Sequence, residues 1–86
     1  MIKVIKQINE HQILIEQDEK SFLVSESIPD IAPQETLVFS CDSEGNISDW
    51  TEVGGEVGCS LDGYMKRLLE SGSIVAPWKY EVDIPW

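Results

Sequence analysis

The sequence predicts a single α+β domain over residues 1–86, with a mainly antiparallel sheet of about five strands and one helix packed on a face. Short apolar segments separated by turn residues recur along the first half of the chain. A complete helical stripe of apolar residues follows after Ser60. An apolar fraction of 42% in 86 residues is ordinary for one small globular domain and argues against intrinsic disorder.

The N-terminal third predicts an antiparallel meander of three strands. Aliphatic and aromatic residues predict strands at 2–8, 13–15 and 22–24. Asn9-Glu10 and Asp18-Glu19 are polar pairs suited to the turns between them.

The middle of the chain predicts a second hairpin. Two prolines mark residues 28–34 as a connecting loop, and residues 36–40 are β-branched and aromatic, as in a strand. A turn follows at residues 42–46, with Gly45 at positive φ, and residues 47–53 return as the partner strand with Trp50 in the core. Gly54, Gly55 and Gly58 predict a flexible loop.

One helix is predicted over Leu61–Ser71, with Ser60 as its N-cap and Gly72 as its stop. At the C-terminus, residues 78–86 alternate between apolar and polar, which predicts an extended segment with one apolar face. Pro85 prevents this segment from being a central strand near its end.

Negative charge is concentrated in one block. Residues 21–65 contain nine carboxylates and no Lys, Arg or His, within a net charge of −10. This disfavours direct binding to nucleic acid and to anionic membranes, and it favours a basic protein partner or no charged partner. The N-terminus lacks signal-peptide features and no apolar run approaches a membrane span, so a cytoplasmic location is expected.

Few residues in the sequence suggest a catalytic or metal-binding site. Cys41 and Cys59 are expected to be reduced thiols, with a single bridge between them as an alternative. His11 lies in a predicted turn, and a solvated side chain is expected. Residues 42–49 resemble a calcium loop, but glycine occupies the fourth position and Val53 the twelfth. A hairpin turn is the preferred interpretation, and weak surface calcium binding is the alternative. We therefore expect a non-enzyme without catalytic residues, cofactor or metal.

The candidate binding residues are of two kinds. Five acids would provide electrostatic complementarity to a partner: Asp42, Glu44, Asp49, Glu52 and Glu56. Three aromatic residues would anchor the contact: Trp78, Tyr80 and Trp86. Alternatively, the segment 78–86 packs back on the domain as an edge strand, or pairs with a second copy to form a homodimer.

Glu35-Thr36-Leu37-Val38-Phe39, then Asp42, Gly45-Asn46, Asp49-Trp50 and Glu52-Val53, form a pattern with a recognisable order. It resembles a pattern in small uncharacterised proteins of bacteriophages and prophages. The resemblance covers about a fifth of the chain and is most specific at Asp49-Trp50. It implies a viral or mobile-element setting and a cytoplasmic site of action, and it transfers no catalytic residues.

Together these features favour a non-enzymatic phage or prophage accessory protein that binds a host or viral protein through an acidic surface and modulates or inhibits it. One alternative is a DNA mimic, whose carboxylates occupy the basic cleft of a nucleic-acid-binding defence or regulatory protein. The other is a structural or self-assembling minor virion protein, paired as a homodimer.

Overall fold

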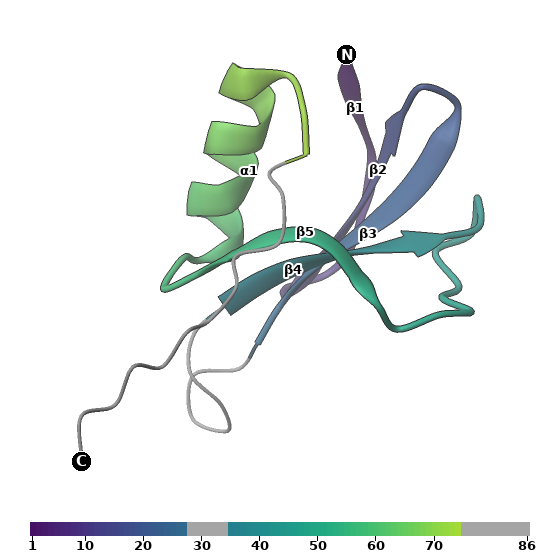
Figure 1. Ribbon diagram of the computed structural model, residues 1–86, viewed down its shortest axis with the longest axis horizontal. Helices are drawn as coiled ribbons and strands as arrows, with labels where there is room; N and C mark the ends of the chain where they lie inside the picture. Colours follow the sequence, from purple (N-terminus) through teal and green to yellow (C-terminus); the bar gives the residue numbers. More distant parts are fainter. Residues whose placement is uncertain (28–34, 75–86) are drawn as a thin grey trace.

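The computed structural model describes residues 1–27 and 35–74. Its strands form one five-stranded antiparallel sheet in the order β1-β2-β3-β4-β5, and one helix follows them (Figure 1). The elements are β1 (Ile2–Asn9), β2 (Gln12–Gln17), β3 (Lys20–Glu26), β4 (Glu35–Cys41), β5 (Glu52–Val57) and α1 (Leu61–Ser71). The α+β class and the antiparallel sheet are confirmed. The predicted loop at 28–34 and the predicted extended segment at 78–86, with Trp78, Tyr80 and Trp86, lie outside the described residues.

The first four strands contain the four segments predicted for them, and each extends further into polar residues. The β2–β3 turn has the positive φ angles of a tight hairpin at both central residues, 52° at Asp18 and 66° at Glu19. Such a turn matches the right-handed twist of the strands it joins, so β2 and β3 pair without a register shift.

The fifth strand differs from the prediction. β5 spans Glu52–Val57 instead of 47–53, and Gly54 and Gly55 are buried inside it. Gly55 has φ +135°, and a Cβ there would lie 2.8 Å from the Leu37 Cα and would also meet the Thr36 carbonyl. The flexible loop predicted from these glycines is wrong, because they allow β5 to approach the β4 backbone closely.

The helix prediction is confirmed at both ends. The Ser60 side chain accepts a hydrogen bond from the Gly63 backbone N–H at 3.2 Å. Gly72 adopts φ 73°, and its N–H donates to the Leu68 carbonyl at 2.9 Å.

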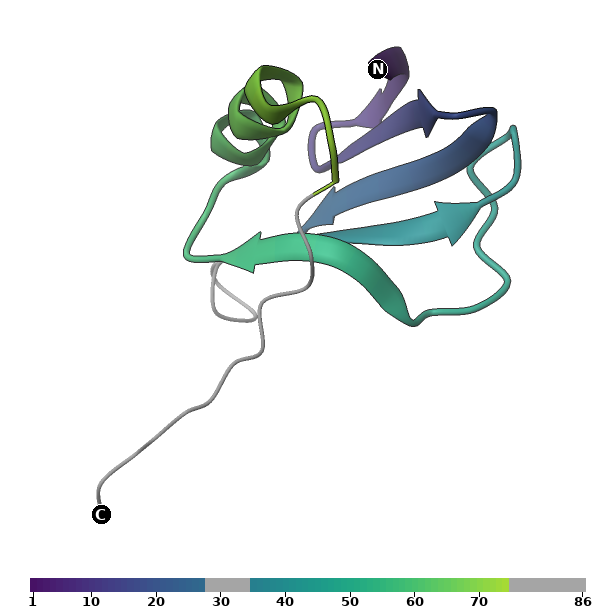
Figure 2. The same ribbon diagram turned by 45° about the horizontal axis from the view of Figure 1, so that its top comes forward.

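Apolar side chains are buried on both sides of the sheet. Figure 2 shows that α1 lies to one side of the strands. Four helix residues, Leu61, Tyr64, Met65 and Leu68, form one buried cluster with Ile2, Ile13, Ile15, Val24, Val38 and Cys59. Successive side chains of a strand point to opposite faces, so Leu14 and its cross-strand neighbours Leu23 and Phe39 point away from that cluster. These three are also buried. We call the side of the sheet that carries them the outer face.

Candidate protein-docking surface

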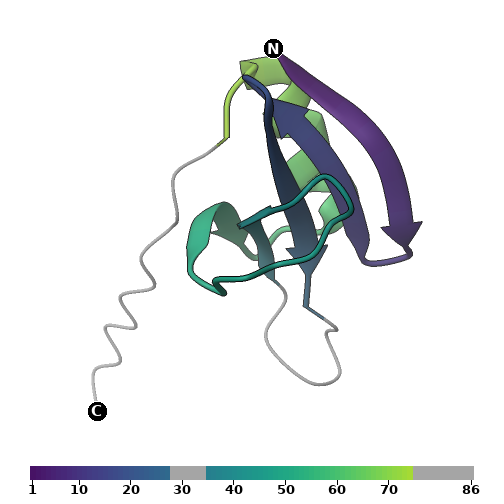
Figure 3. The ribbon, with the colours of Figure 1, turned by 90° about the vertical axis from the view of Figure 1, so that its right-hand side faces the viewer.

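The connection between β4 and β5, residues 42–51, lies against the outer face (Figure 3). Near its start, a Cβ on Gly45 would lie 3.0 Å from the Cδ1 atom of Ile8 in β1. Near its end, the rings of Trp50 and Phe39 meet edge to face with centroids 5.4 Å apart. The connection therefore contacts both the first strand and the fourth, which explains how Leu14 and Leu23 between them are buried.

Asp42 fixes the start of this connection. Its carboxylate accepts hydrogen bonds from the backbone N–H groups of Glu44 and Asn46, both at 2.9 Å. Donation from Asn46, followed by that from Glu44, lowers the pKa of Asp42 from its ordinary value. Gly45 has φ 90°, as predicted, and the turn prediction for residues 42–46 is confirmed.

Near the end of the connection, the Asp49 carboxylate accepts hydrogen bonds from the Thr51 N–H at 3.2 Å and from the Thr51 hydroxyl at 2.9 Å.

Trp50 is the exposed aromatic residue of this surface. The prediction that it lies in the core is wrong, since 68% of the residue is accessible to solvent. The physical reason is the shift of β5 toward the C-terminus, which leaves Trp50 in the connection. A large ring supported by a buried one and open to solvent is typical of residues that dominate binding energy. One feature of the sequence indicates a turn around Trp50. Asp49 precedes Thr51 by two residues, a spacing at which an Asp side chain commonly accepts a hydrogen bond from the backbone.

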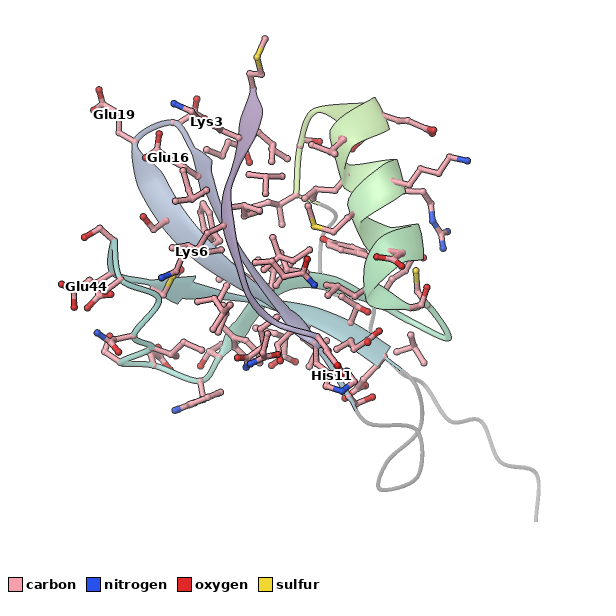
Figure 4. All side chains as sticks on the ribbon, turned by 180° about the vertical axis from the view of Figure 1, so that it is seen from behind. Lys3, Lys6, His11, Glu16, Glu19 and Glu44 are labelled. Atoms are coloured by element: carbon pink, nitrogen blue, oxygen red, sulfur yellow. The ribbon has the colours of Figure 1, made fainter. Side chains whose placement is uncertain are left out.

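Four of the five predicted acids lie on this connection or directly after it. Asp42, Glu44 and Asp49 lie on the connection, Glu52 begins β5 beside Phe39, and all four are exposed. Within the described part of the chain, Glu44 and Glu52 form no ion pair. Figure 4 shows Glu44 extending outward from the connection. The surface therefore combines an exposed indole with unneutralised carboxylates.

Glu56 is placed elsewhere. It lies on the helix side of the sheet, where its carboxylate pairs with the Arg67 guanidinium of α1 at 2.5 Å. Register puts it in one cross-strand row with Thr36 and Glu26. The Thr36 hydroxyl is buried and donates to the Cys59 carbonyl at 2.8 Å. Glu26, Thr36 and Glu56 of this row therefore contact either α1 or Cys59, which precedes its N-cap.

Glu26 makes the third contact of that row. Its carboxylate accepts the Leu61 N–H at 2.6 Å and a hydrogen bond from His11 Nδ1 at 2.9 Å. Because a carboxylate only accepts, Nδ1 must carry the proton. The His11 hydrogen bond and then the Leu61 N–H lower the pKa of Glu26, against an opposing effect of burial. The solvated His11 expected from the sequence is instead about 40% exposed and bound to Glu26.

The two cysteines are free thiols, as expected, and no bridge joins them. Burial raises the pKa of the Cys59 thiol, and the Arg67 guanidinium 3.1 Å away partly offsets this. Burial, followed by the charge of Asp42, raises the pKa of Cys41. Both thiols are therefore poor nucleophiles at neutral pH. Residues 1–27 and 35–74 contain no cluster of three or more His, Cys, Asp or Glu residues that could hold a metal ion.

No protein-family model, curated protein sequence or solved structure matches this chain. Among the described residues, no helix has both the length and the apolar character needed to cross a membrane.

Proposed function

We propose that this chain is a non-enzymatic accessory protein that binds a basic protein partner through the outer-face connection 42–51 and Glu52. The observation that carries the proposal is Trp50, 68% exposed and supported edge to face by buried Phe39. Around it lie exposed carboxylates, so the surface has an aromatic centre and an acidic rim. Interfaces of moderate affinity are commonly built this way.

The two sides of the sheet take different roles in this proposal. The helix packs on one face, where Glu26, Thr36 and Glu56 fasten its first turns. The other face carries the connection, whose Trp50 and acidic residues are exposed among the described residues and would meet the partner. Two members of the acidic block, Glu26 and Glu56, therefore support the fold, and Glu56 is left out of the proposed contact. The resemblance to phage and prophage proteins adds a setting, in which the partner is a host or viral protein.

The roles of charge and apolar contact can be separated by mutation. Wild-type protein and variants would be immobilised and used to capture proteins from a bacterial lysate at 50 mM and 500 mM NaCl, with quantification by mass spectrometry. Trp50→Ala removes the centre, and Glu44→Gln combined with Glu52→Gln removes two charges of the rim. The matched control, Glu10→Gln combined with Glu70→Gln, removes two exposed charges from the β1–β2 turn and the helix.

We expect a basic protein that is retained by the control and lost with Trp50→Ala. Its capture should weaken with the double Gln variant and with salt, because rim charges mainly steer association and are screened. A partner captured equally by wild type and Trp50→Ala would contradict the proposed surface. If the partner is a nucleic-acid-binding protein displaced by DNA, the protein acts as a DNA mimic. Sedimentation as a stable dimer broken by Trp50→Ala would instead favour self-assembly.

A further inference from the structure

The two edge strands of the sheet carry opposite charges. β1 is exposed from Lys3 to Asn9, and at the other edge β5 carries Glu52 and Glu56. Lys3 and Lys6 are two of only six Lys and Arg residues in the whole chain. Neither lysine forms an ion pair with any of the residues the structure describes. An acidic strand would thus be attracted to β1 and repelled from β5.

Irregular pairing in β1 brings the two lysines to the same face. Lys3 lies opposite Glu16 and Lys6 lies opposite Leu14, two residues apart on β2, with a register shift between Val4 and Lys6. The extra residue, Ile5, turns the strand so that Lys6 follows Lys3 on the outer face. Figure 4 shows both lysine side chains leaving β1 on the same side, Lys3 near Glu16 and Lys6 in the direction of Glu44. β1 therefore presents two consecutive positive positions on one face.

Apolar groups of β1 remain uncovered beside these charges. Val4 is 46% exposed, Ile5 43% and Ile8 38%. Val4 lies opposite Ile15, on the helix side of the sheet. Alternate residues of a strand point to opposite faces of the sheet. A strand that fits this edge therefore needs acids at alternate positions, on the face of the lysines, and apolar residues at the positions between them.

The sequence of residues 78–84 has this pattern. Glu81 and Asp83 are two residues apart on one parity, whereas Tyr80, Val82 and Ile84 occupy the other. Lys79 shares the acidic parity, but the two carboxylates outnumber it. Pro85 lacks a backbone N–H, so pairing would end before it.

The start of this segment is within reach of β1. The Gly72 carbonyl at the end of α1 accepts a hydrogen bond from Gln17 Nε2 at 3.3 Å, and Gln17 lies opposite Ile2 in β1. A strand added outside β1 would lie about 10 Å from β2, which is two strand spacings. The six steps from Gly72 to Trp78 span up to about 20 Å when extended. Because the segment is tethered, its effective concentration at the edge is high.

We propose that residues 78–84 of the same molecule add to the free edge of β1 as a sixth strand, with Glu81 and Asp83 on the face of Lys3 and Lys6. Tyr80 and Val82 would then cover the side of Val4. In that arrangement, Trp78 and Tyr80, two of the three residues predicted from the sequence as partner anchors, complete the chain's own sheet. The inference is independent of the docking function proposed for Trp50.

Hydrogen–deuterium exchange of the full chain, resolved by residue with NMR, tests this inference. We expect alternate amides within residues 80–84, those whose N–H groups face β1, to be protected at least tenfold in the wild type, at protein concentrations from 10 to 500 μM, in a protein that sediments as a monomer. Lys3→Glu combined with Lys6→Glu should remove that protection, and so should Glu81→Lys combined with Asp83→Lys. The variant with all four reversals should recover it.

Amides of the β2–β3 hairpin serve as the internal control, since their protection reports whether each variant is folded. Absence of protection at residues 80–84 in the wild type would overturn the proposal. β1 would then be a free edge whose lysines and bulges hinder pairing with another strand. Protection that appears only with dimer formation would overturn it in favour of a second copy. Protection that survives both charge reversals would show that the segment pairs elsewhere.

Discussion

Single side chains contact the beginning of α1, and the contribution of Glu26 to stability depends on pH. The Glu26 carboxylate accepts hydrogen bonds from His11 and from the Leu61 N–H of the helix, and these contacts lower its pKa from the ordinary value of 4.5. A group whose pKa is lowered by folding stabilises the folded state above its unfolded pKa. That stabilisation is lost as pH falls through the folded pKa.

The corresponding prediction concerns Glu26→Gln. We expect the variant to be about 1.5 kcal/mol less stable than the wild type at pH 7, as for loss of hydrogen bonds to a charged group. The difference should shrink as pH falls below 4.5, where the wild type begins to lose its advantage. Urea unfolding at pH 7, 5, 4 and 3 measures it. A difference that stays constant over this range would show that the charge of Glu26 is not involved.

Thr36 gives a second prediction for the same row. It is fully buried, and its hydroxyl donates to the carbonyl of Cys59 just before the helix. Thr36→Val keeps the shape but leaves that carbonyl without its donor, so we expect a loss of about 1–3 kcal/mol. Thr36→Ser keeps the donor and removes one methyl group, with an expected loss of about 1 kcal/mol. Chemical denaturation compares the pair, and a Ser variant less stable than the Val variant would contradict the role of the hydrogen bond.

At the level of elements, the sequence predicts correctly those features whose determining contacts are local. Ser60 and Gly72 bond within a turn of their own positions, so both helix ends follow from the sequence. The β5 prediction failed because the meaning of Gly55 depends on β4, some eighteen residues away. A glycine in a flexible loop and a glycine that permits close approach look alike in sequence. The position of Trp50 was missed for the same reason.

Gly55 and Gly58 form a matched pair for testing the revised role of the glycines. Both have positive φ, but a Cβ on Gly55 meets the β4 backbone, whereas a Cβ on Gly58 meets nothing within 4 Å. Gly58→Ala should cost about 1 kcal/mol from backbone strain alone. Gly55→Ala should cost roughly 3 kcal/mol or more, because β4 and β5 must also separate. Thermal unfolding distinguishes them, and equal losses would mean that β5 does not pack closely on β4.

For the whole molecule, the sequence shows a block of acids. It does not show which of these acids contact the helix and which are exposed on the outer face. Strand register decides this division, since Glu56 faces Arg67 while Glu52 lies beside Phe39 on the outer face. The pairing of β4 with β5 contains a register shift between Val38 and Phe39, and the alternation of residues in the sequence does not indicate such a shift. Four of the acids named from the sequence therefore lie at the candidate surface, where their binding role stays a prediction, and the position of Trp50 there was not predicted.

The unneutralised acids should also affect stability. With a net charge of −10, the folded chain repels itself, and salt should relieve this repulsion. Raising NaCl from 0.01 to 0.15 M shortens the screening length from about 30 to about 8 Å. We therefore expect the melting temperature to rise by about 4–8 °C, the shift that corresponds to about 1 kcal/mol for a domain of this size.

Glu44 and Glu52 should contribute to that rise because both are exposed and have no ion-pair partner among the described residues. The variant Glu44→Gln combined with Glu52→Gln should melt at a higher temperature than the wild type in 0.01 M NaCl, and the gap should narrow in 0.15 M. Glu26→Gln also removes a negative charge, yet it should melt lower at both salt concentrations, since Glu26 is bound to His11 and Leu61. Calorimetry of the three proteins separates the two kinds of acid. If the double variant melts below the wild type at low salt, Glu44 and Glu52 stabilise the fold, which would contradict their assignment as unpaired acids available to bind a partner.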